Sequence, residues 1–326
     1  MKYFYVVFAI SCSLLLITNT YAYQYDLVEP IDKPSVENYE TKELSFLTFG
    51  NQTKVAKAMT KWSGQYNSNF VLSVGDDEGV SSVYDAKWDK VWKNAYKGRL
   101  SKIPWYIVAG NHDWYGNITA QIDYSLNYDS RYFFPSTYFV RESYFGPNKT
   151  KVAWIHIDTN IFYYDFATRE ETEHLGLKYN FEKFGWQSLK AIEDKFKWIE
   201  DRLNNRAQNG FSLSVGHQPL IGKYAQTFQM GRLRPLFEKY RVAAYFSGHE
   251  HVLELETSKI GQSVTYFISG ACSKAHGKCE GFDWGMPVGA LGFLHTIISK
   301  DEMYYEFVES STLEPKMVYQ GKVLPI

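Results

Sequence analysis

The chain has 326 residues, of which 45% are hydrophobic and 17% aromatic, so it holds enough apolar material for a large core and is not a disordered protein. Its formal net charge is −1 and its isoelectric point is ≈ 6.7. Without a basic surplus, nucleic acid or an anionic membrane is not expected to be the main partner.

The first 22 residues have the features of a secretory signal peptide. Lys2 provides a short positive start, an apolar run extends to Ile17, and the small residues Thr20 and Ala22 suit cleavage after Ala22. An uncleaved signal anchor is the alternative, but the run is short for a membrane span. Because no second long apolar run follows, we expect a secreted or lumenal protein, in the endomembrane system or a lysosome-like vacuole, without a transmembrane anchor.

Strands and helices alternate after a polar lead-in segment over residues 23–43. Apolar runs bounded by glycine indicate strands, and apolar residues at helical spacing indicate helices between them. Such alternation is typical of βαβ units and a largely parallel sheet. We predict strands at 44–50, 69–75 and 103–110, and helices at 54–62 and 84–96.

The second half of the chain continues this alternation. The clearest helix is predicted for 186–207, where Leu189, Ile192, Phe196, Ile199 and Leu203 share one face and "NG" ends the helix at Gly210. Further strands are predicted at 151–158, 211–216, 242–248, 264–270 and 291–298, with an antiparallel hairpin at 303–310 and 316–323.

The unbroken alternation and the absence of an internal linker favour one domain over residues 44–326. We expect two sheets packed face to face, with helices outside.

Two cysteines, Cys272 and Cys279, remain after loss of the signal peptide. In an oxidising compartment they are expected to form a disulfide. A metal pair with His276 between them is the alternative, although a structural zinc site needs a fourth ligand. Asn117 and Asn148 begin glycosylation sequons.

Five predicted strands end in glycine followed by a polar residue that can bind a metal. The carboxyl ends of parallel strands line one edge of a sheet, so these side chains should converge. Glycine there lets the chain turn sharply and leaves room for a ligand. The residues after these glycines are Asn51, Asp76 with Asp77, Asn111 with His112 and Asp113, His217, and His249 with His251.

Imidazole, amide carbonyl and carboxylate groups together make a mixed nitrogen and oxygen site for Zn, Fe or Mn. "GHEH" is expected to direct His249 and His251 to one side of an extended segment. A lone Gly-His pair is usually a turn with a surface histidine. His156, His174 and His295 lie outside the strand-end pattern, and no role is assigned to them.

The motifs "GDDEGV", "GNHD", "VGHQP" and "GHEH" resemble those of calcineurin-like metallophosphoesterases, and most closely the purple acid phosphatases of the tartrate-resistant type. The stretches "IPWYIVAGNHDWYGNITAQIDYS" and "LRPLFEKYRVAAYFSGHEH" are particularly similar to that group. The resemblance runs from about Leu44 to the C-terminus. It implies an α/β fold, a four-layer α/β/β/α sandwich of two mixed sheets flanked by helices, with two metal ions.

Carried over residue by residue, the resemblance makes Asp76 the bridge between the two metals. Asn111, His217 and His249 would complete one site, which holds Zn, Mn or Fe(II), and His251 would belong to the other, an Fe(III) site.

The same resemblance implies that a metal-bound hydroxide attacks phosphorus. His112 would hold the phosphate and protonate the leaving oxygen, and Asp113 would orient His112 and set its tautomer.

Two positions depart from the family pattern. Asn51 stands where the family has an aspartate, and Gly79 stands where it has a tyrosine, and both are ligands of the Fe(III) site. Tyr84 is nearby but offset. The second site therefore keeps Asp76 and His251, with a neutral amide oxygen from Asn51. A trivalent ion without two anionic ligands should bind poorly.

The leading interpretation is a metal-dependent phosphoesterase of the acid phosphatase type, which hydrolyses phosphate monoesters of small molecules or phosphoproteins. One alternative is a catalytically impaired, phosphatase-like scaffold or binding protein that has lost the Fe(III) site and has a protein partner. A phosphodiesterase is a third candidate, on analogy of fold alone.

Overall fold

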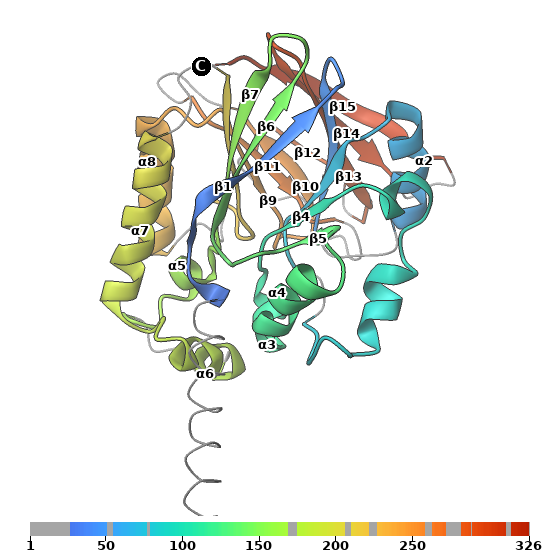
Figure 1. Ribbon diagram of the computed structural model, residues 1–326. Coiled ribbons are helices and arrows are strands. Elements are labelled where there is room, and N and C mark those ends of the chain that lie inside the picture. Colours follow the sequence, from blue (N-terminus) through green and yellow to red (C-terminus); the bar gives the residue numbers. More distant parts are fainter. Residues whose placement is uncertain are drawn as a thin grey trace, which may run out of the picture.

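Two mixed β-sheets lie between helices in this computed structural model (Figure 1). The structure describes residues 27–50, 55–76, 79–168, 175–205, 210–221, 227–257, 263–271, 282–287, 289–310 and 314–325. This architecture confirms the α/β sandwich of two mixed sheets flanked by helices.

The first sheet has eight strands and combines parallel and antiparallel pairs. β7, β8, β9 and β11 run parallel to one another, whereas β10 pairs antiparallel with β11 and with β12. In spatial order the strands are β1 (Ile31–Tyr39), β6 (Phe139–Phe145), β7 (Thr150–His156), β8 (Phe211–Val215), β9 (Ala244–Ser247), β11 (Thr265–Ser269), β10 (Leu253–Glu256) and β12 (Trp284–Gly285).

The second sheet has seven strands. Its β2, β3, β4 and β5 are parallel, and the C-terminal strands add to β2 in antiparallel pairs, as the predicted hairpin requires. In spatial order the strands are β15 (Lys316–Val323), β14 (Met303–Glu309), β13 (Gly292–Ile298), β2 (Leu44–Phe49), β3 (Phe70–Ser73), β4 (Trp105–Ile107) and β5 (Tyr132–Phe133).

Helices cover the outer faces of both sheets. Figure 1 shows α7 and α8 on the side of the first sheet and α2 on the side of the second. Because both faces of the inner strands are covered, β2, β3 and β8 are buried at every position. The helices are α2 (Ala56–Tyr66), α3 (Asn111–Tyr115), α4 (Ile118–Asn127), α5 (Asn160–Tyr164), α6 (Leu175–Lys183), α7 (Leu189–Asn204) and α8 (Phe228–Lys239).

A buried arginine lies in the aromatic core between the sheets. The Arg141 guanidinium stands 3.5 Å from the ring centroid of Tyr106 and 4.3 Å from that of Trp154. Its charge is balanced by Glu37, whose Oε2 accepts from Nη1 at 3.1 Å. Cation–π contact and an ion pair together allow the charge to be buried.

This ion pair shows that the expected lead-in segment is part of the fold. Glu37 belongs to β1, which pairs in parallel with β6 at the edge of the first sheet. The strand was not predicted because its residues are polar and half exposed, with Pro34 among them, as suits an edge strand.

Helix α7 confirms the clearest predicted helix, with two corrections. Ser188 caps its first turn by accepting from the Ala191 amide at 3.1 Å, and Ile192 and Leu203 are fully buried. Leu189, however, is half exposed because it begins the helix, one residue after the cap. The helix ends at Asn204, before Gly210.

The helix predicted for 84–96 is much shorter in the structure. Its regular part is a π-helical turn, η1 (Asp89–Lys93), followed by the 3₁₀ turn η2 (Gly98–Ser101). Trp88 and Trp92 are buried against other aromatic rings: Trp88 stacks on Tyr124 with centroids 3.8 Å apart, and Trp92 meets Trp105 edge-on. Tertiary packing of these large rings overrides the helical pattern.

Several predicted features lie outside the described residues. These are the signal peptide, Asn51, Asp77, His174 and the Cys272–Cys279 segment with His276. Within the described ranges, no helix combines the length and apolarity that a membrane span needs.

The two sequons differ in accessibility. Asn117 accepts a hydrogen bond from the Ala120 amide as the N-cap of α4, and the Thr119 hydroxyl donates to Asn117 at 2.7 Å. Asn148 lies exposed in the turn between β6 and β7. Of the two, Asn148 is therefore the better placed for modification.

Candidate metal centre

Four strand ends from the two sheets meet at one point, as the strand-end pattern predicted. They follow β3 and β4 in one sheet and β8 and β9 in the other. The approach depends on glycine: a Cβ on Gly75 would stand 2.6 Å from both the Gly110 amide and the His217 ring. No side chain fits there without moving the backbone.

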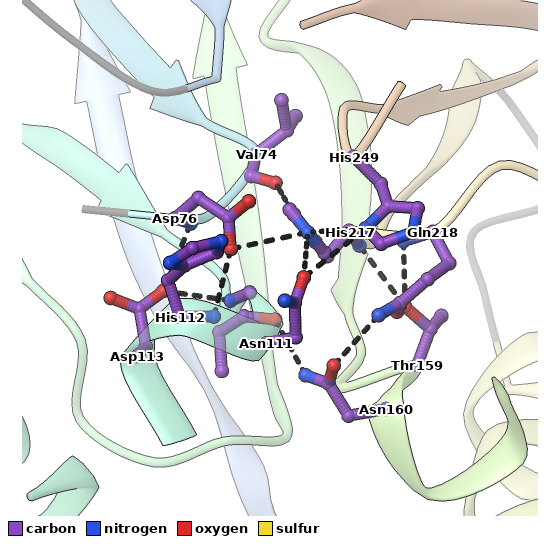
Figure 2. A network of polar contacts seen from close by, with 12 residues as sticks. Val74, Asp76, Asn111, His112, Asp113, Thr159, Asn160, His217, Gln218 and His249 are labelled. Carbon is purple, nitrogen blue, oxygen red and sulfur yellow. Dashed lines mark hydrogen bonds and ion pairs between the residues drawn. The ribbon is translucent and has the colours of Figure 1, made fainter. Parts of the chain in front are cut away.

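The side chains at these strand ends form a compact set of donor atoms, shown in Figure 2. His217 Nε2 is 3.3 Å from Asp76 Oδ1 and 3.1 Å from Asn111 Oδ1. His249 Nδ1 is 3.1 Å from Asn111 Oδ1 and 3.2 Å from His217 Nε2. We call Asp76, Asn111, His217 and His249 the donor cluster.

The tautomer of His217 leaves a ring nitrogen that can bind a cation. His217 Nδ1 is 2.6 Å from the Val74 carbonyl oxygen, which can only accept, so Nδ1 carries a proton. In the neutral ring Nε2 then holds a lone pair, and it faces the oxygens of Asp76 and Asn111. Such facing lone pairs can be satisfied by a proton from the His249 ring, by a second proton on His217, or by a metal ion.

The spacing of the donor cluster fits such an ion. A tetrahedral ion with nitrogen and oxygen ligands at about 2.0–2.1 Å holds those ligands about 3.3 Å apart, close to the 3.1–3.3 Å found here. The ligand atoms of Asp76, His217 and His249 lie within 4.8 Å of one another. One carboxylate, one amide oxygen and two imidazoles suit Zn, Mn or Fe.

Two members of the donor cluster have left-handed backbone conformations. Asp76 has φ 65° and His249 has φ 59°. Such angles are unfavourable for residues other than glycine and are concentrated at functional sites. They turn the chain sharply after Gly75 and Gly248, so that these side chains point at His217.

Burial and mutual charge set the pKa values in the cluster. Burial and the nearby His217 lower the pKa of His249 to about 3, so this ring is neutral. Burial opposes ionisation of Asp76 and His217, but each stabilises the charge on the other. The pKa of Asp76 is therefore lowered and that of His217 raised.

Asp113 connects the loops instead of orienting His112. Its Oδ2 accepts from the amides of Gly110 at 2.8 Å and Asp76 at 3.0 Å, and its Oδ1 accepts from Gln121 Nε2 at 3.1 Å. The His112 ring is not among its donors in the described part of the chain. The expected role of Asp113 in setting the His112 tautomer is thus corrected: Asp113 caps α3 and fixes the Asp76 loop. Burial, with the nearby Asp76, raises its pKa to about 6.

His112 lies at the solvent-exposed side of the cluster. Its backbone amide donates to Asp76 Oδ1 at 3.0 Å, and its exposed ring meets Tyr115 edge-on with centroids 5.4 Å apart. The ring can therefore reach a molecule that approaches the cluster from solvent.

His251 is not in the three-residue metal group of Asp76, His217 and His249. The extended "GHEH" geometry was wrong, because the left-handed φ of His249 breaks the alternation of side chains. His251 is half buried and close enough to His249 to lower the pKa of that ring.

Gly79 has no space for a side chain. A Cβ there would overlap the His112 carbonyl oxygen and stand 2.8 Å from the Gly116 amide. A tyrosine could not simply be added at this position. Tyr84 is 81% exposed and its hydroxyl bonds to that of Tyr128 at 2.9 Å, so it points to a neighbouring aromatic residue.

The sequence prediction missed a set of buried polar residues behind the donor cluster. Asp158, Thr159 and Asn160 follow β7, and Gln218 follows His217; all four are completely buried. Burial raises the pKa of Asp158 to about 7. The available signal was "IHIDTN", an apolar strand that ends in three polar residues but lacks the glycine of the other strand ends.

A comparison with known protein families identifies the fold. The family model for calcineurin-like phosphoesterases matches residues 48–253, more than half of the chain, and the chain belongs to that family. This confirms the predicted resemblance.

Acid phosphatases are among its relatives. The chain is 29% identical to human tartrate-resistant acid phosphatase type 5 over 308 residues, which cover 85% of this chain and 91% of that protein. It is 30% identical to the mouse protein of the same name, over 78% of this chain and 80% of that one. Identity to purple acid phosphatase 4 of Arabidopsis thaliana is 25%, over 82% and 80% of the two chains.

Solved structures share the fold. GAP50, described as the anchor in the inner membrane complex of Plasmodium, superposes with a TM-score of 0.69 at 20% identity, over 88% of this chain and 90% of that one. A purple acid phosphatase from yellow lupin seeds superposes with a TM-score of 0.57 at 16% identity, over 88% of this chain and 55% of that one.

Proposed function

We propose that the protein is a metal-dependent phosphomonoesterase of the acid phosphatase type, with one tightly held ion in the donor cluster. The observation that carries this proposal is the convergence of Asp76, Asn111, His217 and His249 at 3.1–3.3 Å. A divalent ion there would supply a Lewis acid and a nucleophile at neutral pH. The acid phosphatase relatives support phosphate monoesters as the substrate class.

The chain's own residues would bind and protonate the substrate. The backbone amide of His112 contacts Asp76, which places the exposed His112 ring next to the cluster. The ring can therefore contact the leaving oxygen of a phosphate bound there. General acid help of this kind typically contributes 10²–10⁴-fold. Asp113 would act indirectly, by holding the loops of Asp76 and Asn111 together.

The second, iron site is proposed to be weak or lost. Backbone atoms fill the space beside Gly79, so that position offers no phenolate, and Asn51 offers a neutral amide at most. This observation also favours a second candidate function, a phosphatase-like binding protein with a protein partner. Hydrolysis by the purified protein would separate the two.

We also propose a secreted or lumenal location, with removal of residues 1–22 and a single domain from residue 44 onward. The positively charged start, the short apolar run and Ala22 support cleavage. A small phosphorylated molecule or a phosphoprotein would then be met outside the cytosol.

Metal analysis combined with an ester assay tests the proposed function. The purified protein, stripped with a chelator and reloaded with Zn²⁺ or Mn²⁺, should hold one ion and hydrolyse p-nitrophenyl phosphate. A matched preparation without metal should be inactive. A loaded protein that binds one ion yet hydrolyses neither this ester nor a phosphopeptide would reject the enzyme and support the binding protein.

A further inference from the structure

A chain of buried hydrogen bonds lies next to the donor cluster (Figure 2). We propose that Thr159, Asn160 and Gln218 are positioning residues, a relay that sets the separation of Asn111 and His217 and so controls metal affinity. This inference rests on the proposed function of the donor cluster as a metal site. We call these three side chains the relay.

The relay begins at the backbone of His217. Thr159 Oγ1 accepts from the amide of His217 at 3.2 Å and from the amide of Gln218 at 3.0 Å, and its hydroxyl proton is donated to Gln218 Oε1. A hydroxyl has one donor and two acceptor positions, and here all three are used. The orientation of the Thr159 hydroxyl is therefore fixed.

The relay ends at the strand that precedes Asn111. Gln218 Nε2 donates to Asn160 Oδ1 at 2.7 Å, and Asn160 Nδ2 donates to the Ala109 carbonyl at 3.1 Å and to Asp158 Oδ1 at 2.8 Å. Each amide thus has its oxygen and nitrogen in a single arrangement. Reversal of either amide would place like groups against each other.

Strand pairing alone does not fix the distance that the relay spans. Ala109 follows β4 in the second sheet, whereas His217 follows β8 in the first, so no ladder of backbone hydrogen bonds joins them. The contact of 3.1 Å between His217 Nε2 and Asn111 Oδ1 depends on this separation. Ligand distances in metal sites lie within about 0.2 Å of their standard values.

Burial makes the relay sensitive to the loss of a single polar group. Thr159, Asn160 and Gln218 have no exposed surface, so an unpartnered amide would lack water as a substitute. The loops that carry Asn111 and His217 would then shift. Residues beyond the direct ligands commonly change metal affinity by about 10–100-fold when they are replaced.

Thr159→Val is the sharpest test because it keeps the shape and removes the hydroxyl. Zn²⁺ affinity is measured on the folded full chain by competition with a chromophoric chelator. We expect about 10–100-fold weaker binding for Thr159→Val, and affinity close to that of the parent for Thr159→Ser, which retains the hydroxyl. A role in packing alone gives the opposite order, because serine lacks the methyl group.

Thr137→Val is the matched control. Thr137 is also completely buried, and its hydroxyl donates to the Val28 carbonyl at 2.7 Å, without a contact to the relay. This variant should lose stability but keep its Zn²⁺ affinity. Loss of affinity in Thr137→Val equal to that in Thr159→Val would overturn the relay, because any buried defect would then suffice.

Failure of the relay can be told apart from failure of the metal site. If the parent binds no Zn²⁺, the proposed function fails. If the parent binds Zn²⁺ and Thr159→Val binds it equally well, the site stands and the relay is rejected. Should Thr159→Val not fold, Gln218→Met, which keeps the volume and removes both amide groups, takes its place with the same expected loss and the same contrary outcome.

Discussion

His217 and His295 are both buried histidines with a carboxylate neighbour, yet their surroundings differ. His295 Nδ1 lies 2.9 Å from Glu306 Oε2, and its Nε2 lies 3.0 Å from the Ser45 hydroxyl. The neutral ring can donate to the carboxylate and accept from the hydroxyl, so both ring nitrogens have a partner. We call His295, Glu306 and Ser45 the balanced cluster, because its ring nitrogens need no ligand from outside the chain.

The donor cluster does not balance in this way. His217 Nδ1 donates its proton to the Val74 carbonyl. Its Nε2 faces the oxygens of Asp76 and Asn111 as well as the ring of His249. In a neutral His217 ring the Nε2 lone pair is therefore available to a metal ion, and the side chains come from four strand ends. The comparison teaches that burial beside a carboxylate does not by itself make a histidine a candidate ligand; a ring nitrogen that faces other potential ligand atoms does.

The largest expected effect is a loss of metal binding when His217, but not His295, is replaced. His217→Ala removes one of four donors and should weaken Zn²⁺ binding by more than the roughly 100-fold reached by indirect changes. His295→Gln keeps a donor and an acceptor in the balanced cluster and should bind Zn²⁺ as the parent does. Equilibrium dialysis followed by metal analysis measures both.

His249→Ala is the second ligand variant and should behave as His217→Ala does. Far-ultraviolet circular dichroism confirms that each variant is folded. Retention of one Zn²⁺ ion by both variants would show that these two rings do not hold the ion.

The next effect concerns catalysis instead of binding. His112→Ala removes an exposed ring whose backbone amide still contacts Asp76, so the metal should remain while kcat for p-nitrophenyl phosphate falls by about 10²–10⁴-fold. Kinetics with matched metal content measure the change. An equal loss of metal and of activity would instead make His112 part of the donor cluster.

A smaller effect is expected from filling the space beside Gly79. The Cβ of Gly79→Ala would overlap the His112 carbonyl, so the free energy of unfolding should fall by about 1–3 kcal/mol. Gly64→Ala is the control: this helical glycine has nothing within 4 Å of an added Cβ, and alanine should stabilise by roughly 0.5–1 kcal/mol. Urea denaturation of both variants checks the pair, and an unaffected Gly79→Ala would show that a side chain fits there.

The lack of space beside Gly79 also bears on the second metal site expected from the sequence. Gly79→Tyr would not simply supply the tyrosine of the family pattern, because the backbone of α3 and Gly116 occupies the space beside Gly79. A tyrosine at this position would therefore require the loop to move.

Local patterns predicted the inner strands and the donor cluster because both depend on short stretches of sequence. The apolar runs of β2, β3 and β8 are buried on both faces, and glycine followed by a polar residue marks Asp76, Asn111, His217 and His249. Edge strand β1 gave no apolar signal, since its side chains are half exposed.

Interactions between distant segments could not be predicted. The relay joins residues about 50–60 positions apart, and no spacing rule links Asn160 to Gln218. The contacts of Asp113 and the backbone turn before His251 could not be predicted for a similar reason: the first depend on the amides of the Asp76 loop, and the second on the left-handed conformation of His249.

The smallest effect is a pH dependence that belongs to the balanced cluster. Burial lowers the pKa of His295 although Glu306 raises it in part. Below the unfolded-state value of about 6.5, the unfolded chain binds a proton that the native ring refuses, so this histidine makes the native state less stable as pH falls. His295→Gln lacks this penalty, and the stability advantage of the parent over this variant should shrink by up to about 2 kcal/mol between pH 7 and pH 5.

The difference between the two chains is the quantity to measure, since other buried groups act in the opposite direction. The raised pKa values of Asp113 and Asp158, about 6 and about 7, favour the native state as pH falls, but they contribute equally to parent and variant and cancel. Urea denaturation with a chelator present removes the contribution of bound metal. If the stability advantage of the parent over His295→Gln grows toward acid pH, the effect of Glu306 outweighs that of burial. The native His295 ring would then be charged, and the balanced cluster would bind a proton.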